Sequence, residues 1–209
     1  MVIKTENDES KAPGEKTTKK PILGWGVCGS FCTLGRACAA AEQLRESYDI
    51  VPIVNRTVGE TDTRFGKAAQ LVGRIAEICG KEPIRTIKDA EPLGPARPLD
   101  LLLIAPCTGN TLSKIAHGIT DTPVTMAAKA HLRSDRPLII ALASNDALSG
   151  SFPSLARCAM RKNIFFVPLA QDDPQNKPYS LVCDFFRIPQ TLQAAADRRQ
   201  LQPVIAGKG

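Results

Sequence analysis

The sequence predicts an α/β domain with three layers, in which helices cover both faces of a mostly parallel sheet. Residues 100–105 and 137–145 are apolar along most of their length rather than alternating, as in strands that are covered on both faces. Strand-like and helix-like segments alternate along the chain. The 209 residues, 43% of them hydrophobic, are enough for one substantial core. One α/β domain is therefore expected.

The first twenty residues differ in composition from the rest, because they are rich in charge and contain almost nothing apolar. Such a segment cannot offset the entropy lost on ordering. We therefore expect a disordered tail at residues 1–20 and a single domain at residues 21–209.

The expected elements alternate between strand and helix. In the first half, strands are predicted at 22–27, 49–54 and 83–87, and helices at 34–46 and 64–79, the last closed by Gly80. In the second half, strands are predicted at 100–105, 137–145 and 163–167, and helices up to residue 117 and at 123–132, 154–162 and 180–196, with a break at Pro189. Residues 171–178 are rich in turn formers.

Charge and aromatic content narrow the class of partner. The formal charge is +6 and the pI is near 9.0, but Lys and Arg are scattered and only 5% of residues are aromatic. A nucleic-acid surface interleaves clustered cations with stacking rings, so no nucleic-acid partner is expected. The basic excess suits small anions such as phosphates and dicarboxylates.

Cysteine usage indicates the compartment. Seven cysteines, an odd number without regular spacing, indicate reduced thiols and a cytoplasmic protein. The sequence has neither an apolar run of about 20 residues nor an export signal, so no membrane partner is expected. His117 and His131 lie near predicted helix ends, where we expect caps, and no cysteine cluster near them indicates a metal site.

Small polar residues follow the predicted strands. The carboxyl ends of parallel strands meet at one edge, so these residues are expected to face one crevice; they are Thr108, Asn110, Thr111, Ser144 and Asn145. Residues 106–111 suit a polar ligand such as a flavin ribityl chain or ring edge, and helix capping is the alternative. Cys107 is interpreted as a buried structural cysteine rather than a nucleophile.

Two further segments suggest anion binding. Residues 26–31 place two glycines and Ser30 before a helix start, where a phosphate is favoured; a Ser N-cap with a turn glycine is the alternative. In residues 61–66, Asp62 or Thr63 is expected to cap the next helix. Arg64 then falls in a first turn, where a cation is disfavoured, and is either a fork for a carboxylate or phosphate or a surface arginine.

Longer motifs carry a family resemblance. Segments 29–33, 61–68, 105–112, 118–132 and 171–174 resemble the family of dipicolinate synthase B subunits, in the same order from about residue 22 to residue 205. This family is similar to the wider flavin-binding group of cysteine decarboxylases and flavin prenyltransferases. The resemblance implies a Rossmann-like flavoprotein fold for residues 21–209 and a homo-oligomer with FMN between subunits.

The resemblance also implies site residues, carried over motif by motif. The implied FMN contacts are Gly29, Ser30, Phe31, Asn55, Thr108, Asn110, Thr111, Ser144 and Asn145. For a planar dicarboxylate, cationic forks and an orienting hydroxyl are needed, and the candidates are Thr33, Arg64 and Lys129. No catalytic residue is assigned.

The implied activity is the oxidation of dihydrodipicolinate to dipicolinic acid during bacterial sporulation. A dehydrogenase-like A subunit is the expected partner and holder of NAD(P). The alternatives are a stand-alone flavin-dependent decarboxylase or prenyltransferase, or a non-catalytic partner that stabilises the A subunit. Two departures argue against the stand-alone enzymes: residues 55–67 lack the histidine of the decarboxylases, and Met126 stands where the prenyltransferases carry an arginine.

Overall fold

The computed structural model describes residues 19–206, so the predicted tail at residues 1–20 lies almost entirely outside the described residues. The described chain builds a seven-stranded sheet in the order β2-β1-β3-β4-β7-β6, and β5 also pairs with β4. The strands are β1 (Ile22–Val27), β2 (Asp49–Val54), β3 (Leu101–Cys107), β4 (Leu138–Ser144), β5 (Ile164–Phe166), β6 (Leu169–Ala170) and β7 (Leu181–Cys183). β1 to β5 pair in parallel, and β7 runs antiparallel to β4 and β6.

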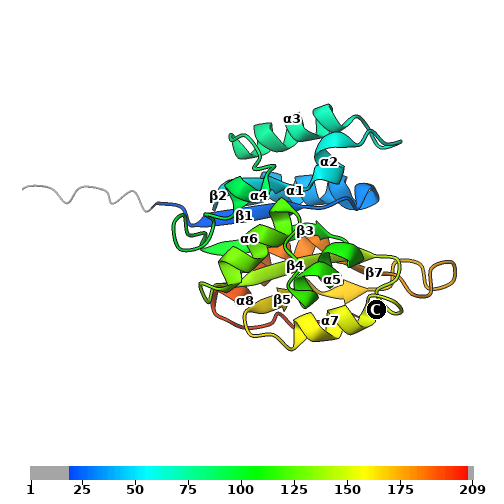
Figure 1. Cartoon of the computed structure of the whole chain (residues 1–209). Coiled ribbons are helices and arrows are strands. Elements are labelled where there is room, and N and C mark those ends of the chain that lie inside the picture. Colours follow the sequence, from blue (N-terminus) through cyan, green and yellow to red (C-terminus); the bar gives the residue numbers. More distant parts are fainter. Residues whose placement is uncertain (1–18, 207–209) are drawn as a thin grey trace, which may run out of the picture.

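Helices cover both faces of the sheet, which confirms the predicted three layers (Figure 1). α1 and α8 pack on one face; α5, α6 and α7 cover the other. The helices are α1 (Leu34–Leu44), α2 (Arg56–Glu60), α3 (Ala68–Cys79), α4 (Ile87–Ala90), α5 (Gly109–His117), α6 (Pro123–Leu132), α7 (Phe152–Ala159) and α8 (Ile188–Ala196), with 3-10 turns η1 (Phe31–Thr33) and η2 (Phe185–Arg187).

The core lies along the central strands. Every residue of β3 is buried, and β4 is buried up to Ser144. Covering on both faces is why these strands read as continuous apolar runs rather than alternating ones. Each fully buried Leu or Ile stabilises the fold by roughly 1.5 to 3 kcal/mol through removal of apolar surface from water.

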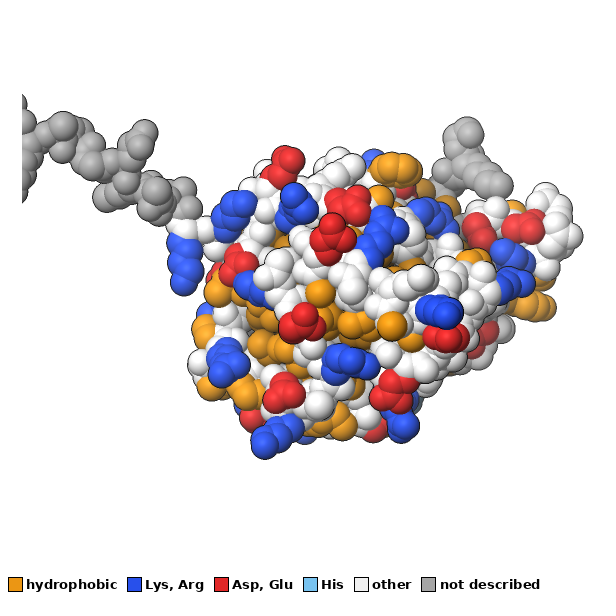
Figure 2. All heavy atoms as spheres, turned by 90° about the horizontal axis from the view of Figure 1, so that it is seen from above, with side chains coloured by type: hydrophobic (Ala, Val, Ile, Leu, Met, Phe, Trp, Pro, Cys, Tyr) orange, Lys and Arg blue, Asp and Glu red, His pale blue; other side chains and the backbone are white. Residues whose placement is uncertain are grey.

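α3 lies at the edge of the domain, against α1 and β2. Figure 2 looks down on this side of the molecule and shows a band of hydrophobic side chains among charges of both signs. Ile75 and Ile78 of α3 are buried, whereas Leu71 is only half-buried.

The region between β2 and α3 corrects two predictions. The helix expected at 64–79 begins at Ala68, and α2 forms between the predicted strand 49–54 and that helix, where no helix was predicted. Residues 63–66 instead make a tight turn, in which Thr63 and Gly66 exchange two backbone hydrogen bonds of 3.0 and 3.1 Å. Asp62 accepts a hydrogen bond from the amide of Ala68 at 2.9 Å, so this carboxylate satisfies the start of α3 from outside the helix.

Two other segments also differ from prediction. The strand expected at 83–87 is reduced to a single bridge between Ile53 and Ile84. In the segment 180–196, residues 181–183 form β7 instead of helix, because pairing with the edge of β4 overrides local propensity. Pro189 lies in the first turn of α8, where its missing N–H costs nothing, so it begins this helix rather than breaking it.

The two histidines have different roles. His117 lies within 2.8 Å of the Ser113 carbonyl at the end of α5, in agreement with a cap. His131 is fully buried, and its Nε2 lies 2.8 Å from the carbonyl of Pro137, so it joins α6 to the start of β4 rather than capping its own helix. Burial lowers the pKa of His131 to about 4, so it is neutral at pH 7.

Candidate functional site

A hollow of about 610 Å³ opens at the carboxyl ends of β1, β3 and β4. We call it the rim hollow. Its walls come from the start of η1 and α1, the turn 63–66, the start of α5, the residues after β4 and the segment 172–182. It brings together eight of the predicted site residues: Gly29, Ser30, Phe31, Thr33, Arg64, Thr108, Ser144 and Asn145.

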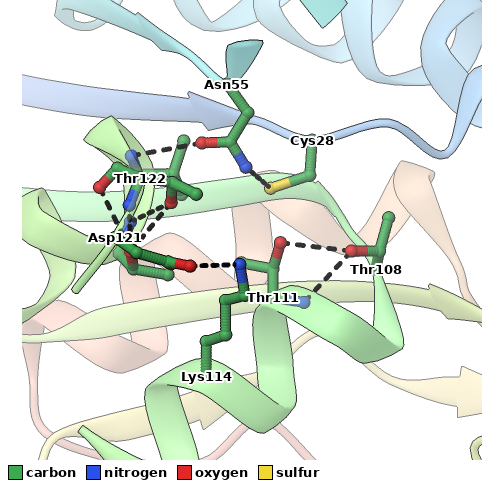
Figure 3. A network of polar contacts seen from close by, with 9 residues as sticks. Cys28, Asn55, Thr108, Thr111, Lys114, Asp121 and Thr122 are labelled. Carbon is green, nitrogen blue, oxygen red and sulfur yellow. Dashed lines mark hydrogen bonds and ion pairs between the residues drawn. The ribbon is translucent and has the colours of Figure 1, made fainter. Parts of the chain in front are cut away.

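Two predicted cofactor residues, Asn55 and Thr111, are buried and are not among the residues that line the rim hollow. Figure 3 shows them in a network of hydrogen bonds with Cys28 and Thr108. Asn55 is 7% exposed; its amide donates to the sulfur of Cys28 at 3.4 Å and its carbonyl accepts from the amide of Val124 at 3.3 Å. Thr111 is 4% exposed and accepts a hydrogen bond from the hydroxyl of Thr108 at 3.1 Å. The polar atoms of both side chains are therefore engaged in hydrogen bonds inside the protein. These bonds connect β1, β2, α5 and α6.

Two other predicted residues lie away from the rim hollow. Asn110 is exposed in the first turn of α5 and is not among the lining residues. Lys129 lines a separate hollow of about 230 Å³, together with Arg133 and Arg161. Lys129 and Arg64, both candidates for dicarboxylate binding, therefore line different hollows.

The start of α1 is open. Ser30 precedes η1 and Thr33 precedes α1, yet neither side chain makes a capping hydrogen bond, so the predicted alternative of a Ser N-cap is not formed. The hydroxyl of Thr33 donates to the backbone carbonyl of Ser30 at 3.0 Å. The first turn of α1 contains no acid and carries Arg36. The amide of Leu34 bonds to the carbonyl of Phe31, so α1 continues the turn η1, and its positive charge at the hollow comes from the helix dipole and from Arg36.

The start of α5 is closed. The side chain of Thr108 accepts from the amide of Thr111 at 3.2 Å, which makes it the N-cap. Asp146 accepts hydrogen bonds from Ser144 at 2.5 Å and Ser151 at 2.9 Å, and these bonds lower the pKa of its carboxyl group. A Cβ added to Gly109 would lie 2.8 Å from Oδ1 of Asp146. The carboxylate therefore lies directly against the first residue of α5.

Sequence reasoning missed four charged residues of the rim hollow, namely Arg36, Asp146, Asp172 and Lys177. Arg36 carried a usable signal, because it is a cation in a first turn, as Arg64 was expected to be. Asp146 directly follows a predicted site residue. Asp172 and Lys177 reach the hollow only because β6 and β7 fold back along β4, which no local pattern indicates.

The cysteines provide no activated nucleophile in the buried part of the site. Cys107 is fully buried, and burial raises the pKa of its thiol well above the usual range, as expected for a structural cysteine. All seven cysteines are free thiols. Within residues 19–206, no cluster of three or more His, Cys, Asp or Glu side chains could hold a metal ion. No helix in that same range is both long and apolar enough to cross a membrane.

Comparison with known proteins identifies the fold family. The model of the family described as Flavoprotein matches residues 10–151. The chain belongs to the flavoprotein family. This flavoprotein is 45% identical over 184 residues to the dipicolinate synthase B subunit of Bacillus subtilis (strain 168), an alignment that covers 88% of this chain and 92% of the relative.

Solved structures agree with that assignment. The crystal structure of the dipicolinate synthase B subunit from Bacillus halodurans superposes with a TM-score of 0.83 and 40% identity, covering 91% of this chain and 98% of the other. A dodecameric FMN-dependent UbiX-like decarboxylase from Escherichia coli O157:H7 has a TM-score of 0.55 and 21% identity, covering 70% and 79% of the two chains. At that identity it shares the fold alone. By homology, this flavoprotein is a relative of dipicolinate synthase B subunits.

Proposed function

We propose that this flavoprotein binds FMN in the rim hollow and acts as the B subunit of a dipicolinate synthase. The observation that carries the proposal is the 45% identity to the Bacillus subtilis protein, which extends over 88% of the chain and so includes every wall of the hollow rather than one motif. The fold alone would not support an activity, because related folds host several chemistries.

The residues of the rim hollow fit a phosphorylated flavin. The segment before α1, with Gly29 and Ser30, offers backbone N–H groups and a hydroxyl to a phosphate. Phe31 offers an aromatic face, and Thr108 and Asn145 offer polar groups to a ribityl chain or ring edge. Bound FMN would supply a two-electron carrier, with the nicotinamide of the A subunit as the final acceptor. Asn55 and Thr111 would support the site through the hydrogen bonds that position β1 and α5.

The proposed reaction removes two hydrogens from dihydrodipicolinate, one as hydride to NAD(P) on a dehydrogenase-like A subunit and one as a proton, and gives dipicolinic acid. The role proposed for this chain is to shape and charge the substrate cavity beside the flavin site. We place this activity in bacterial sporulation and in the cytoplasm. The reducing conditions of the cytoplasm suit a protein with seven unpaired cysteines.

A homo-oligomer is part of the proposal. A groove of about 410 Å³ between α1 and α3 adjoins the rim hollow, shares Phe31 and Phe65 with it, and includes half-buried Leu71. Phe65 is 55% exposed, an apolar ring that a second copy would cover. The UbiX-like decarboxylase of the same fold is itself dodecameric. Light scattering on the purified chain tests this point, and a monomer would contradict it.

One experiment separates the proposal from its alternatives. The A and B proteins are purified singly and together, with an absorbance spectrum recorded before and after addition of dihydrodipicolinate. We expect a flavin spectrum from the B protein and faster dipicolinate formation by the pair than by the A protein alone. Full activity of the A protein alone would make this chain a non-catalytic partner. Carbon dioxide release by this chain alone from a candidate acid would instead support a stand-alone decarboxylase.

A further inference from the structure

The charges of the rim hollow are not balanced internally. Lys177 pairs with Asp172 at 3.2 Å, and Asp172 also accepts from Ser180 at 2.8 Å. Asp146 is satisfied by two serine hydroxyls. Within residues 19–206, Arg36 and Arg64 form neither an ion pair nor a hydrogen bond. Two guanidinium groups in one hollow are thus available to bind an anionic ligand.

The backbone that carries Arg64 is well fixed. Arg64 and Phe65 form the tip of the turn 63–66, whose ends are joined by two backbone hydrogen bonds, and the amide of Phe65 donates to the hydroxyl of Thr63 at 3.1 Å. Gly66 adopts a φ of 137°, which side chains rarely allow. The guanidinium carbon of Arg64 lies 4.9 Å from the centre of the Phe65 ring. The tip therefore presents a ring and a cation together beside the hollow.

Arg36 approaches from a different element. It lies in the first turn of α1, and its guanidinium carbon lies 5.2 Å from the ring centre of Phe185 in η2. A cation at the positive end of a helix is unfavourable unless an anion lies nearby. Contact with an aromatic face holds the charge without neutralising it. Arg36 and Arg64 are thus two oriented, unneutralised forks on separate elements of the same hollow.

We propose that Arg36 and Arg64 form a pair that selects a dicarboxylate, each guanidinium taking one carboxylate group. This inference rests on the proposed function, since it assigns the substrate contacts of that same site. Guanidinium binds carboxylate through two parallel N–H···O bonds, so a guest with two carboxylates satisfies both forks and a monocarboxylate leaves one unused.

The test measures binding of pyridine-2,6-dicarboxylate and pyridine-2-carboxylate to the full-length chain by isothermal titration calorimetry. For the unaltered protein we expect the dicarboxylate to bind at least about tenfold more tightly. Arg36→Gln and Arg64→Gln should each weaken dicarboxylate binding about tenfold and bring it toward the affinity of the monocarboxylate. Arg36→Lys and Arg64→Lys should recover part of the loss. Lys129→Gln, in the separate hollow, is the matched control and should change neither affinity.

Each result has a clear reading. Equal affinities for the two acids, or no measurable binding by the unaltered chain, would overturn the inference. The inference would also be overturned if both glutamine variants kept dicarboxylate binding and lost FMN binding. The two arginines would then hold the cofactor phosphate. FMN binding is measured separately by flavin absorbance. A chain that takes up no FMN but discriminates between the acids through both arginines would contradict the proposed flavin site and leave this pair intact.

The side chains of Arg36 and Arg64 are both exposed, so the unfolding midpoints of their variants should match that of the unaltered protein.

Discussion

Two helix starts at the same rim of the sheet have opposite electrostatic character. α5 begins with a capping threonine, Thr108, and with the carboxylate of Asp146 against its first residue. α1 begins without a side-chain cap or an acid in its first turn, and with Arg36. Both follow buried strands and both are rich in small polar residues. A similar composition therefore gives a helix start at α5 that is already neutralised and a helix start at α1 that attracts an anion. We expect the negatively charged group of a ligand to bind at α1.

The largest expected effect comes from crowding the closed start. In Gly109→Ala, the new Cβ would lie 2.5 Å from the hydroxyl of Ser144 and 2.6 Å from that of Ser151, both of which are held by Asp146. We expect a loss of about 2 kcal/mol in the free energy of unfolding, measured by urea denaturation. Gly73→Ala is the matched control, because nothing lies within 4 Å of its Cβ in α3, and it should stabilise by about 0.5 to 1 kcal/mol. Equal behaviour of the two variants would contradict the crowding.

The next effect concerns the open start. Ser30→Ala removes a hydroxyl that makes no capping bond and accepts from the hydroxyl of Thr33, which also donates to the Ser30 carbonyl, so we expect the free energy of unfolding to stay within about 0.5 kcal/mol of the unaltered protein. FMN affinity should fall about tenfold, because a hydrogen bond to the phosphate is lost. Flavin fluorescence titration measures this, with Ser134→Ala after α6 as the control. Unchanged FMN affinity would contradict the binding of the phosphate at the start of α1.

Removing the cap of α5 should have a smaller effect. Thr108→Val keeps the shape of the side chain but leaves the amide of Thr111 without its partner at 3.2 Å. We expect about 1 kcal/mol of destabilisation in urea denaturation, whereas Thr108→Ser should keep most of the stability. If valine and serine are equivalent here, α5 does not depend on its cap, and the two helix starts differ less than their hydrogen bonds indicate.

The smallest effect is pH-dependent. The folded pKa of Asp146 is lowered by its bonds to Ser144 and Ser151, so its contribution is present above the ordinary carboxyl pKa of 3.8 and is lost as pH falls through the lowered value. We expect Asp146→Asn to cost about 0.5 kcal/mol at pH 7, reduced for solvent screening, and nothing at the acid limit. His131 stays neutral in the folded protein down to its pKa of about 4, whereas in the unfolded chain it is protonated below about 6.5. Both proteins therefore lose stability as pH falls from 6.5 toward 4. The difference between them isolates Asp146, and a difference independent of pH would contradict its role.

Local sequence was sufficient for much of the fold. β1, β2 and α6 begin and end where the pattern places them. α6 is the clearest case, since Thr122 caps it within a capping box and Pro123 occupies its first turn. The strands β6 and β7 could not be predicted, because two or three residues carry no periodicity and form a strand only against an existing edge.

The candidate site was predictable in part. Parallel topology places the residues after β1, β3 and β4 at one rim, so Ser30, Thr108 and Ser144 share one hollow. Sequence could not show that Asn55 is taken up by Cys28 and Val124, which come from distant parts of the chain. Nor could it show that Lys129 faces another hollow, because the direction of a side chain depends on how its helix packs.

By itself, the sequence determined the α/β class, the central buried strands and the small polar residues at their carboxyl ends, because these depend on apolar runs and on the residues that stop them. Only the tertiary structure decided which of those residues remain free. Hydrogen bonds and charges between distant segments neutralise α5 through Asp146 and leave Arg36 and Arg64 unpaired beside α1 within residues 19–206. The open or closed state of each helix start depends on such long-range partners, which a local pattern does not encode.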